Sequence, residues 1–306
     1  MKPIEMPAKH TLLYSSALIV IGMVIFLALV WGGSAGTPPV TGDAQFEGEK
    51  AYQDVVTQVE TGPRTIGSEA HQKTVDWIQT ELKAAGWSVT IQEITYQGQP
   101  VQNIIAKKGS GDHWDVVGAH YDSRLVADQD PDPNKRQQAV PGANDGASGV
   151  GVLLELARSL PEDLDKQVWL VFFDTEDNGN IPGYDWILGS RAFVEQLESK
   201  PDRALIVDMI GDADLNIYME RNSDEVINNH IWEIAKNLGY DRQFIPSYKY
   251  SMLDDHTPFL EAGIPAADII DFDYPYWHTT SDTVDKVSVA SLDAVGDTVL
   301  QWLIDP

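Results

Sequence analysis

The chain has 306 residues, 43% of them hydrophobic, so it is long enough to bury the core of one large domain. Its 47 acidic and 21 basic residues give a formal net charge of −26, which argues against nucleic-acid binding because a polyanion would be repelled. The absence of cysteine excludes disulfides, a cysteine nucleophile and thiolate metal ligands, so any metal must be held by His, Asp and Glu.

A candidate membrane anchor lies near the N-terminus. The segment Leu12–Trp31 is almost wholly apolar and has about the 20 residues that a helix needs to span a bilayer. Lysines precede this segment, and the next positive charge after it is Lys50, so the positive-inside tendency places the N-terminus in the cytoplasm. We therefore expect a single-pass membrane protein whose main domain is extracytoplasmic. The alternative is a cleaved signal peptide, which would make the protein secreted.

The anchor sets the expected division of the chain. A run rich in Gly and Pro follows it and is typical of a short linker. The rest of the sequence contains no internal repeat and no low-complexity tract. We expect a cytoplasmic N-terminus, a transmembrane anchor, a linker and one folded domain, at residues 1–11, 12–32, 33–43 and 44–306.

Beyond the linker, the spacing of apolar residues alternates between helical and strand-like patterns. In chain order we expect a helix at Glu69–Ala85, strands at Trp87–Tyr96, Val101–Ala106 and Trp114–Gly118, a helix at Gly149–Leu160, a strand at Val168–Phe173, a helix at Ile187–Leu197, a strand at Ala204–Ile210, a helix at Glu225–Leu238, a strand at Ala266–Ile270 and a helix at Ser291–Leu303. This alternation predicts a three-layer α/β/α sandwich around a mixed, mostly parallel sheet. Sites in such sheets gather beyond the carboxyl ends of the strands.

Acidic residues and histidines fall at those places in the sequence. They occur in GAHYDS (His120), PGANDGASG (Asp145), FFDTEDNG (Glu176 and Asp177), IVDMIGD (Asp208) and YPYWHTTSDT (His278). A carboxylate after a strand is usually a turn former or a cap when it is taken alone. So many carboxylates at one sheet edge would repel one another unless a cation were present. His, Asp and Glu are the ligand types of catalytic zinc, so the pattern predicts a zinc centre.

The adjacent pair Glu176-Asp177 indicates a division of labour. One carboxylate would bind the metal, and its neighbour, pointing elsewhere, would move protons. This arrangement suits hydrolysis or acyl transfer.

Several motifs in order resemble peptidase family 28 of the metallopeptidases. They are GPRTIGS, AHYDS, GANDGASGVGVLLELAR, FFDTED, GSRAF, VDMIG, DDHTPFLEAGIPA and WHTTSDT. The resemblance covers about residue 44 to the C-terminus and implies an enzyme that acts on peptide or protein N-termini. It implies His120 and Asp208 on one zinc, Asp177 and His278 on a second, Asp145 as a bridge and Glu176 as the general base. The family usually has Glu where this chain has Asp177, which would alter the ligand geometry.

The same family includes one-zinc glutaminyl cyclases, whose ligands correspond to Asp145, Asp177 and His278. Their resemblance implies proton transfer by Glu176 with help from Asp208 and a further acid, and this chain has such an acid in Asp254. It also implies a pocket walled by tryptophans. The candidates for this wall are Trp277, directly before His278, and Trp186 in a long loop.

These features favour a glutaminyl-peptide cyclotransferase over a two-zinc aminopeptidase. Each feature has a plainer interpretation: Trp277 as strand-end packing, Trp186 as a hydrophobic anchor of the helix Ile187–Leu197, and Asp254 as a helix N-terminal acid. A binding ectodomain without catalysis is a further alternative, against which the complete ligand set argues. We expect His256 and the remaining histidines to be structural or on the surface: His10, His71, His113 and His230. The sequence does not indicate an oligomeric state.

Overall fold

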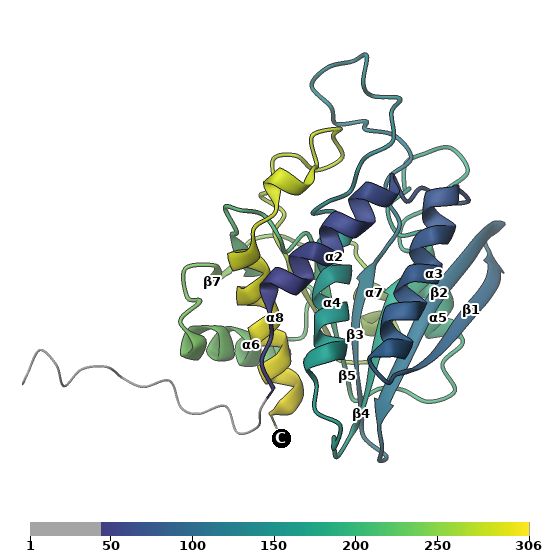
Figure 1. The fold of residues 1–306 in the computed structure, drawn as a ribbon. Helices are drawn as coiled ribbons and strands as arrows, with labels where there is room; N and C mark the ends of the chain where they lie inside the picture. Colours follow the sequence, from purple (N-terminus) through teal and green to yellow (C-terminus); the bar gives the residue numbers. More distant parts are fainter. Residues whose placement is uncertain (1–43, 306) are drawn as a thin grey trace, which may run out of the picture. The chain divides into compact units, whose positions relative to one another are not determined.

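The computed structural model describes residues 44–305 (Figure 1). The anchor predicted at 12–32 and the linker predicted at 33–43 lie outside these residues. Within residues 44–305, none of the helices combines the length and the apolar character needed to cross a membrane. The helices are α2 (Gly48–Thr61), α3 (Glu69–Ala84), α4 (Ala147–Ser159), α5 (Leu188–Glu195), α6 (Glu225–Leu238), α7 (Thr257–Glu261) and α8 (Val289–Ile304).

The main sheet is mixed, as the sequence predicts. Its strand order is β1-β2-β4-β3-β5-β8, and β6 and β7 form a separate small sheet. The pairs β1–β2 and β2–β4 are antiparallel, whereas β4–β3, β3–β5 and β5–β8 are parallel. The strands are β1 (Ser88–Tyr96), β2 (Gln99–Gly109), β3 (Trp114–His120), β4 (Gln167–Phe173), β5 (Arg203–Asp208), β6 (Ile217–Met219), β7 (Phe244–Tyr248) and β8 (Ala266–Ile270). The carboxyl ends of β4, β3, β5 and β8 therefore meet at one edge.

Two apolar clusters cover the two faces of the sheet. Successive strand residues alternate between them: Val117 joins the large cluster with residues of α2, α4, α6 and α8, whereas Val116 joins the smaller cluster. The smaller cluster contains Phe193 of α5 and Phe259 of α7. This alternation is the period-two pattern of a strand buried on both sides. Helices thus cover both faces, with α2, α3 and α4 in front of the sheet in Figure 1.

Helix α4 lies unusually close to the sheet because it carries glycine where it crosses the strands. A Cβ atom at Gly149 would lie 2.6 Å from the carbonyl oxygen of Val207 and 2.8 Å from Cβ of Ala119. On another side of the helix, a Cβ at Gly151 would lie 2.6 Å from the carbonyl oxygen of Ala51 in α2. The close approach brings the start of α4, and Asp145 just before it, to the ends of β3 and β5.

Candidate metal centre and active site

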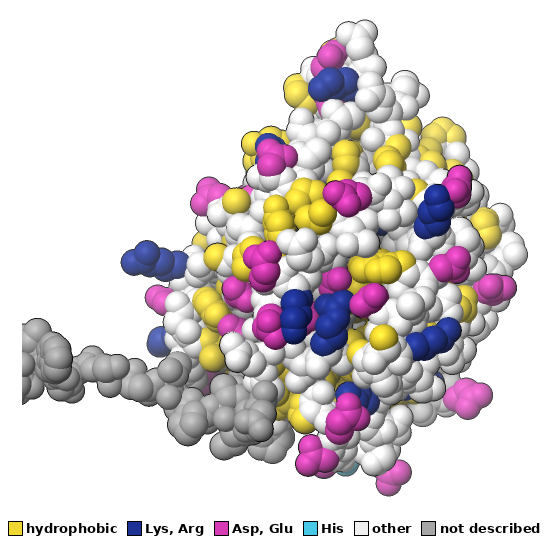
Figure 2. Space-filling view, in the orientation of Figure 1, with side chains coloured by type: hydrophobic (Ala, Val, Ile, Leu, Met, Phe, Trp, Pro, Cys, Tyr) yellow, Lys and Arg dark blue, Asp and Glu magenta, His cyan; other side chains and the backbone are white. Residues whose placement is uncertain are grey.

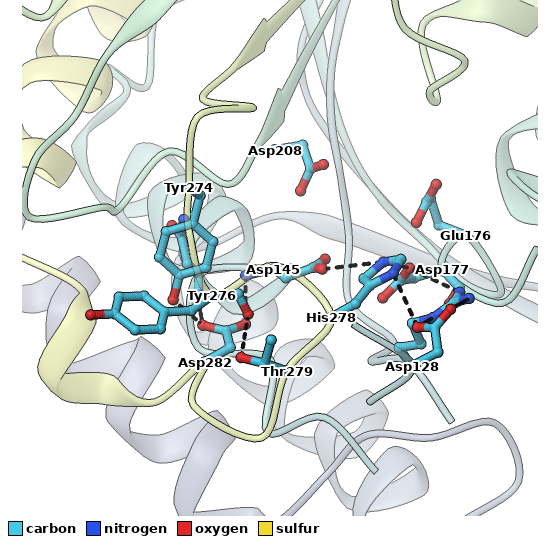
Figure 3. A network of polar contacts seen from close by, with 12 residues as sticks. Asp128, Asp145, Glu176, Asp177, Asp208, Tyr274, Tyr276, His278, Thr279 and Asp282 are labelled. Carbon is cyan, nitrogen blue, oxygen red and sulfur yellow. Dashed lines mark hydrogen bonds and ion pairs between the residues drawn. The ribbon is translucent and has the colours of Figure 1, made fainter. Parts of the chain in front are cut away.

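The residues predicted for the site gather at the carboxyl edge of the parallel strands (Figure 3). His120 is the last residue of β3 and Asp208 is the last residue of β5. Glu176 and Asp177 follow β4, His278 follows β8, and Asp145 precedes α4. All six are buried or nearly so, with at most 8% of any of them exposed.

Two groups of side chains have the spacing of metal ligands, and they share Asp145. In the first group, Nε2 of His120 lies 3.1 Å from Oδ1 of Asp145 and 3.2 Å from Oδ1 of Asp208. In the second, Nε2 of His278 lies 2.8 Å from Oδ1 of Asp177 and 3.8 Å from Oδ2 of Asp145. The grouping matches the sets that the sequence predicts, and the metal-binding roles of these residues remain predictions.

The spacing and the unpaired atoms fit zinc. Zinc bonds of about 2.0–2.2 Å in tetrahedral geometry place neighbouring ligand atoms about 3.3–3.6 Å apart, within the range of the contacts above. The Oδ2 atoms of Asp145 and Asp177 are buried and have no hydrogen-bond partner. Leaving such atoms unpaired costs free energy, which a bound cation would offset. Because the two groups share Asp145, the residues could hold one ion or two.

A second ring of carboxylates orients these side chains. Oδ1 of Asp122 lies 3.5 Å from Nδ1 of His120, on the opposite side of the ring from Asp145. The Asp122 carboxylate also accepts hydrogen bonds from the backbone N–H groups of Glu176 and Asp177, at 3.1 and 3.4 Å. Asp282 accepts from the backbone N–H of Asp145 at 3.1 Å. A carboxylate beside the second nitrogen of a metal-binding histidine orients its ring, and Asp122 stands in that position without forming a hydrogen bond to Nδ1 of His120.

Burial and crowding strongly shift the protonation of the site. Burial raises the pKa of Asp208 to about 7 and that of Asp177 to about 6. It also raises the pKa of Glu176 well above its usual range, and the neighbouring Asp177 adds to this effect. Burial alone would lower the pKa of His278, but Asp177 and Asp128 raise it to about 9. The simultaneous ionisation of these carboxyl groups is therefore unfavourable, because their negative charges repel one another. A divalent cation would relieve that repulsion.

Backbone strain also concentrates here. Thr175, Met209 and His278 have positive φ angles of 56°, 48° and 55°. Non-glycine residues in this region cost about 1–3 kcal/mol each and persist where the surrounding structure holds them, often at functional sites. Thr175 precedes Glu176 and Met209 follows Asp208, so the strained residues aim the side chains of the site.

A pocket of about 220 Å³ opens beside the two metal groups. Its polar lining includes Asp145, Glu176, Asp177, Asp208 and Asp254, and its apolar lining is Trp186, Met209, Met252, Leu253, Ile270, Phe272 and Trp277. The ring of Trp277 stacks on His278 with centroids 3.6 Å apart, and Trp186 stacks on it at 6.0 Å. Both tryptophans and Asp254 thus lie at the pocket, as the sequence predicts; their roles in substrate binding and proton transfer stay predictions.

The other histidines lie outside both metal groups. Buried His256 has Nε2 3.4 Å from Oε2 of Glu220, and buried His71 has Nε2 2.8 Å from Oδ1 of Asp174. His113 is exposed and His230 is partly exposed, and His10 lies outside the described residues.

Sequence reasoning missed two residues of the site. Oδ1 of Asp128 lies 3.5 Å from Nδ1 of His278, and buried Arg124 holds Asp128 in place. No periodic pattern in the sequence marks either residue, because both belong to a long loop whose conformation depends on tertiary contacts. Their nearness to the AHYDS motif is the one hint in the sequence.

Comparison with known proteins agrees with this arrangement. The sequence profile of peptidase family M28 matches residues 103–303, which include every residue of the two metal groups. The chain belongs to peptidase family M28. The resemblance predicted from the ordered motifs is therefore confirmed.

Members of this family with different activities are similar to the chain. A glutaminyl cyclase from Porphyromonas gingivalis is 34% identical with a TM-score of 0.80, over 85% of this chain and 98% of that one. A Zn-dependent exopeptidase from Parabacteroides distasonis is 30% identical with a TM-score of 0.81, over 87% and 100%. The aminopeptidase YwaD of Bacillus subtilis is 31% identical over 69% of this chain, which spans only 46% of YwaD. These relatives support a family M28 enzyme and a zinc site, and they divide between two reactions.

Proposed function

We propose that this chain is a zinc-dependent glutaminyl-peptide cyclotransferase, which converts an N-terminal Gln to pyroglutamate and releases ammonia. One observation carries the proposal: Asp254 lines the same pocket as Glu176 and Asp208. Besides burial, Asp254 contributes to raising the pKa of both of these carboxylates. A cluster of carboxylates that retains a proton near neutral pH is suited to passing one proton within the pocket.

The reaction needs such a transfer. The α-amine nitrogen of the substrate attacks the side-chain amide carbon, a C–N bond forms to close the ring, and the bond to the amide nitrogen breaks. One proton must move from the α-amine to the leaving nitrogen, and no water is consumed. Glu176 would carry this proton. Asp208 and Asp254 would share the negative charge of the carboxylate cluster with it.

The chain's other residues would bind and orient the substrate. A pocket of about 220 Å³ suits one side chain of glutamine size, and the rings of Trp186 and Trp277, which line it, would contact that side chain and exclude water. Zinc held by Asp145, Asp177 and His278 would polarise the amide carbonyl.

A two-zinc aminopeptidase is the second candidate, and one observation favours it. The side chains of His120, Asp145 and Asp208 have the spacing of metal ligands, which supports a second ion. In that enzyme Glu176 would activate water for hydrolysis. We also propose that the substrates are N-termini of peptides or proteins outside the cytoplasm, reached by a domain that the segment 12–32 anchors to a membrane.

The test uses the full-length zinc-loaded protein and two peptides that differ only in an N-terminal Gln or Leu. Mass spectrometry would follow the products. We expect loss of ammonia from the Gln peptide and an unchanged Leu peptide. Release of free Leu would instead establish the aminopeptidase. If neither peptide changes although zinc is bound, the proposal fails in favour of a binding ectodomain.

The variant Asp254→Asn sharpens the test, because it nearly preserves shape and removes one acid. We expect it to bind zinc like the parent and to lose most of the cyclisation rate. The variant Asp112→Asn makes the same chemical change at an exposed turn and serves as the matched control.

A further inference from the structure

Arg124 is almost completely buried, with 1% of its surface exposed, and each of its three guanidinium nitrogens donates at least one hydrogen bond. Its Nε and Nη2 donate to the two oxygens of Asp128 at 2.8 and 3.0 Å, a bidentate pair. Its Nη1 donates to the carbonyl oxygen of Asp177 at 2.9 Å, and its Nη2 also donates to the carbonyl oxygen of Gly179 at 3.1 Å. One side chain thus fastens the loop that follows β3 to the loop that follows β4.

Asp128 also approaches His278, which lies in the loop after β8. Oδ1 of Asp128 lies 3.5 Å from Nδ1 of His278, and Figure 3 marks this contact. The backbone N–H of Gln129 donates to the carbonyl oxygen of His278 at 3.2 Å. The ring of His278 therefore has Asp128 on its Nδ1 side, close by but without a hydrogen bond, and Asp177 on its Nε2 side, so Nε2 is the nitrogen that faces the metal group.

The same guanidinium also lies against the pocket wall. Its central carbon is 5.1 Å from the ring centroid of Trp186, within the range of a cation–π contact. Trp186 lines the pocket and stacks on His278. Arg124 is thus in contact with the backbone of one predicted ligand, with the carboxylate that orients another, and with a pocket tryptophan.

We propose that Arg124 is a positioning residue that, together with Asp128, sets the geometry of the Asp177–His278 half of the metal centre and of the Trp186 wall. Lysine cannot replace it, because an ammonium group lacks the planar fork that meets two carboxylate oxygens and two carbonyls at once. The other group, His120, Asp145 and Asp208, has no contact of this kind with Arg124, so the effect should be confined to one half of the centre.

The inference rests on the zinc centre and not on the choice between cyclisation and hydrolysis, because zinc binding is read without substrate. The variants Arg124→Lys and Asp128→Asn would be compared with the parent in the full-length protein. Zinc affinity would be measured by competition with a chelator, and ligand geometry by the visible absorption of the Co²⁺-substituted protein. Thermal unfolding of the metal-free proteins would report stability separately.

The chain offers a matched control in Arg203. It forms a bidentate pair with Asp115 at 3.0 and 2.9 Å, and its guanidinium lies 4.1 Å from the ring of Trp302. Asp115 and Arg203 lie near the starts of β3 and β5, at the opposite edge of the sheet from the site. Arg203→Lys therefore removes a bidentate arginine–carboxylate pair and an arginine–tryptophan contact, as Arg124→Lys does, without altering the metal groups.

We expect Arg124→Lys and Asp128→Asn to weaken zinc binding about 10–100-fold and to change the Co²⁺ spectrum. Arg203→Lys should keep the parent's affinity and spectrum even if its stability falls. Parent-like zinc binding in both site variants would overturn the role of Arg124, and so would an equal loss in Arg203→Lys. If Arg124→Lys does not fold, Asp128→Asn decides alone. A parent that binds no zinc would overturn the metal centre itself.

Discussion

Nε2 of His120 lies 3.1 Å from Oδ1 of Asp145, while the second oxygen of Asp145 is buried without a hydrogen-bond partner. The second oxygen faces His278, so Asp145 is the one residue that both metal groups share. We expect Asp145→Asn to lower zinc content in both groups, because an amide is a poorer zinc ligand than a carboxylate and carries no charge. Metal analysis of the purified protein would measure this.

Asp208→Asn is the informative comparison for that variant. Asp208 belongs only to the group with His120, so in Asp208→Asn an ion bound by Asp145, Asp177 and His278 should remain. A parent-like zinc content in Asp145→Asn would contradict its bridging position.

Glu176 lines the pocket but belongs to neither metal group. We expect Glu176→Gln to retain zinc and to lose turnover by about 10²–10⁴-fold, because the amide cannot accept and return a proton. Product formation measured at matched zinc content would separate this effect from metal loss. Substantial activity in Glu176→Gln would exclude it as the proton carrier for either reaction.

The elements that the sequence predicts best are those with a strong local signal. The strand β8, Ala266–Ile270, is apolar except for Asp268 and is buried along its whole length, and its observed bounds are the predicted ones. Helix α6 also has its predicted bounds, because Asp224 caps its start and Gly239, in the left-handed conformation, ends it.

The elements that escaped prediction lack such signals. Helix α2 begins after Glu47, which makes no side-chain capping bond, and its apolar residues are few. The strands β6 and β7 are short, and most of β7 is exposed. Helix α7 has only five residues. Tertiary contacts rather than local sequence define these segments.

The site divides in the same way. His120, Asp208 and Asp145 were predictable because strand ends and helix starts converge at one edge of a parallel sheet. Arg124 and Asp128 lie in a loop without regular structure, so only the folded chain brings them against His278. Long-range contacts of this kind leave no periodicity in a single sequence.

The position of α4 on the sheet gives a prediction about stability. Replacing a helical glycine by alanine ordinarily stabilises a helix by about 1 kcal/mol. At Gly149 we expect the opposite, a loss of about 1–3 kcal/mol, because the new Cβ would lie 2.6 Å from the carbonyl oxygen of Val207. Urea unfolding would measure the difference, and a more stable Gly149→Ala would show that α4 can move away from β5 without cost.

The raised pKa values of the site predict how stability depends on pH. In the metal-free protein, burial raises the pKa of Asp208 to about 7 and that of Asp177 to about 6, above the value of about 3.9 expected in the unfolded chain. Between these values the folded protein binds more protons than the unfolded one. The contribution of these two groups to the free energy of unfolding therefore falls as the pH rises from about 4 to 7.

His278 acts in the same direction at higher pH. Its pKa is raised to about 9, so its contribution is present below about pH 6.5 and is lost as the pH rises through 9. We expect the metal-free protein to melt at a higher temperature at pH 5.5 than at pH 7.5. Because zinc displaces the same protons, added zinc should raise the melting temperature more at pH 7.5 than at pH 5.5.

The general repulsion in a chain of net charge −26 would also weaken as the pH falls, so the site needs its own control. Asp208→Asn removes one carboxyl group whose pKa is raised, whereas Asp112→Asn removes one exposed charge far from the site. If the site governs the slope, the first variant flattens the pH dependence of the metal-free protein and the second leaves it unchanged. An equal effect of the two variants would assign the slope to surface charge, since only the buried group has a proton that zinc must displace.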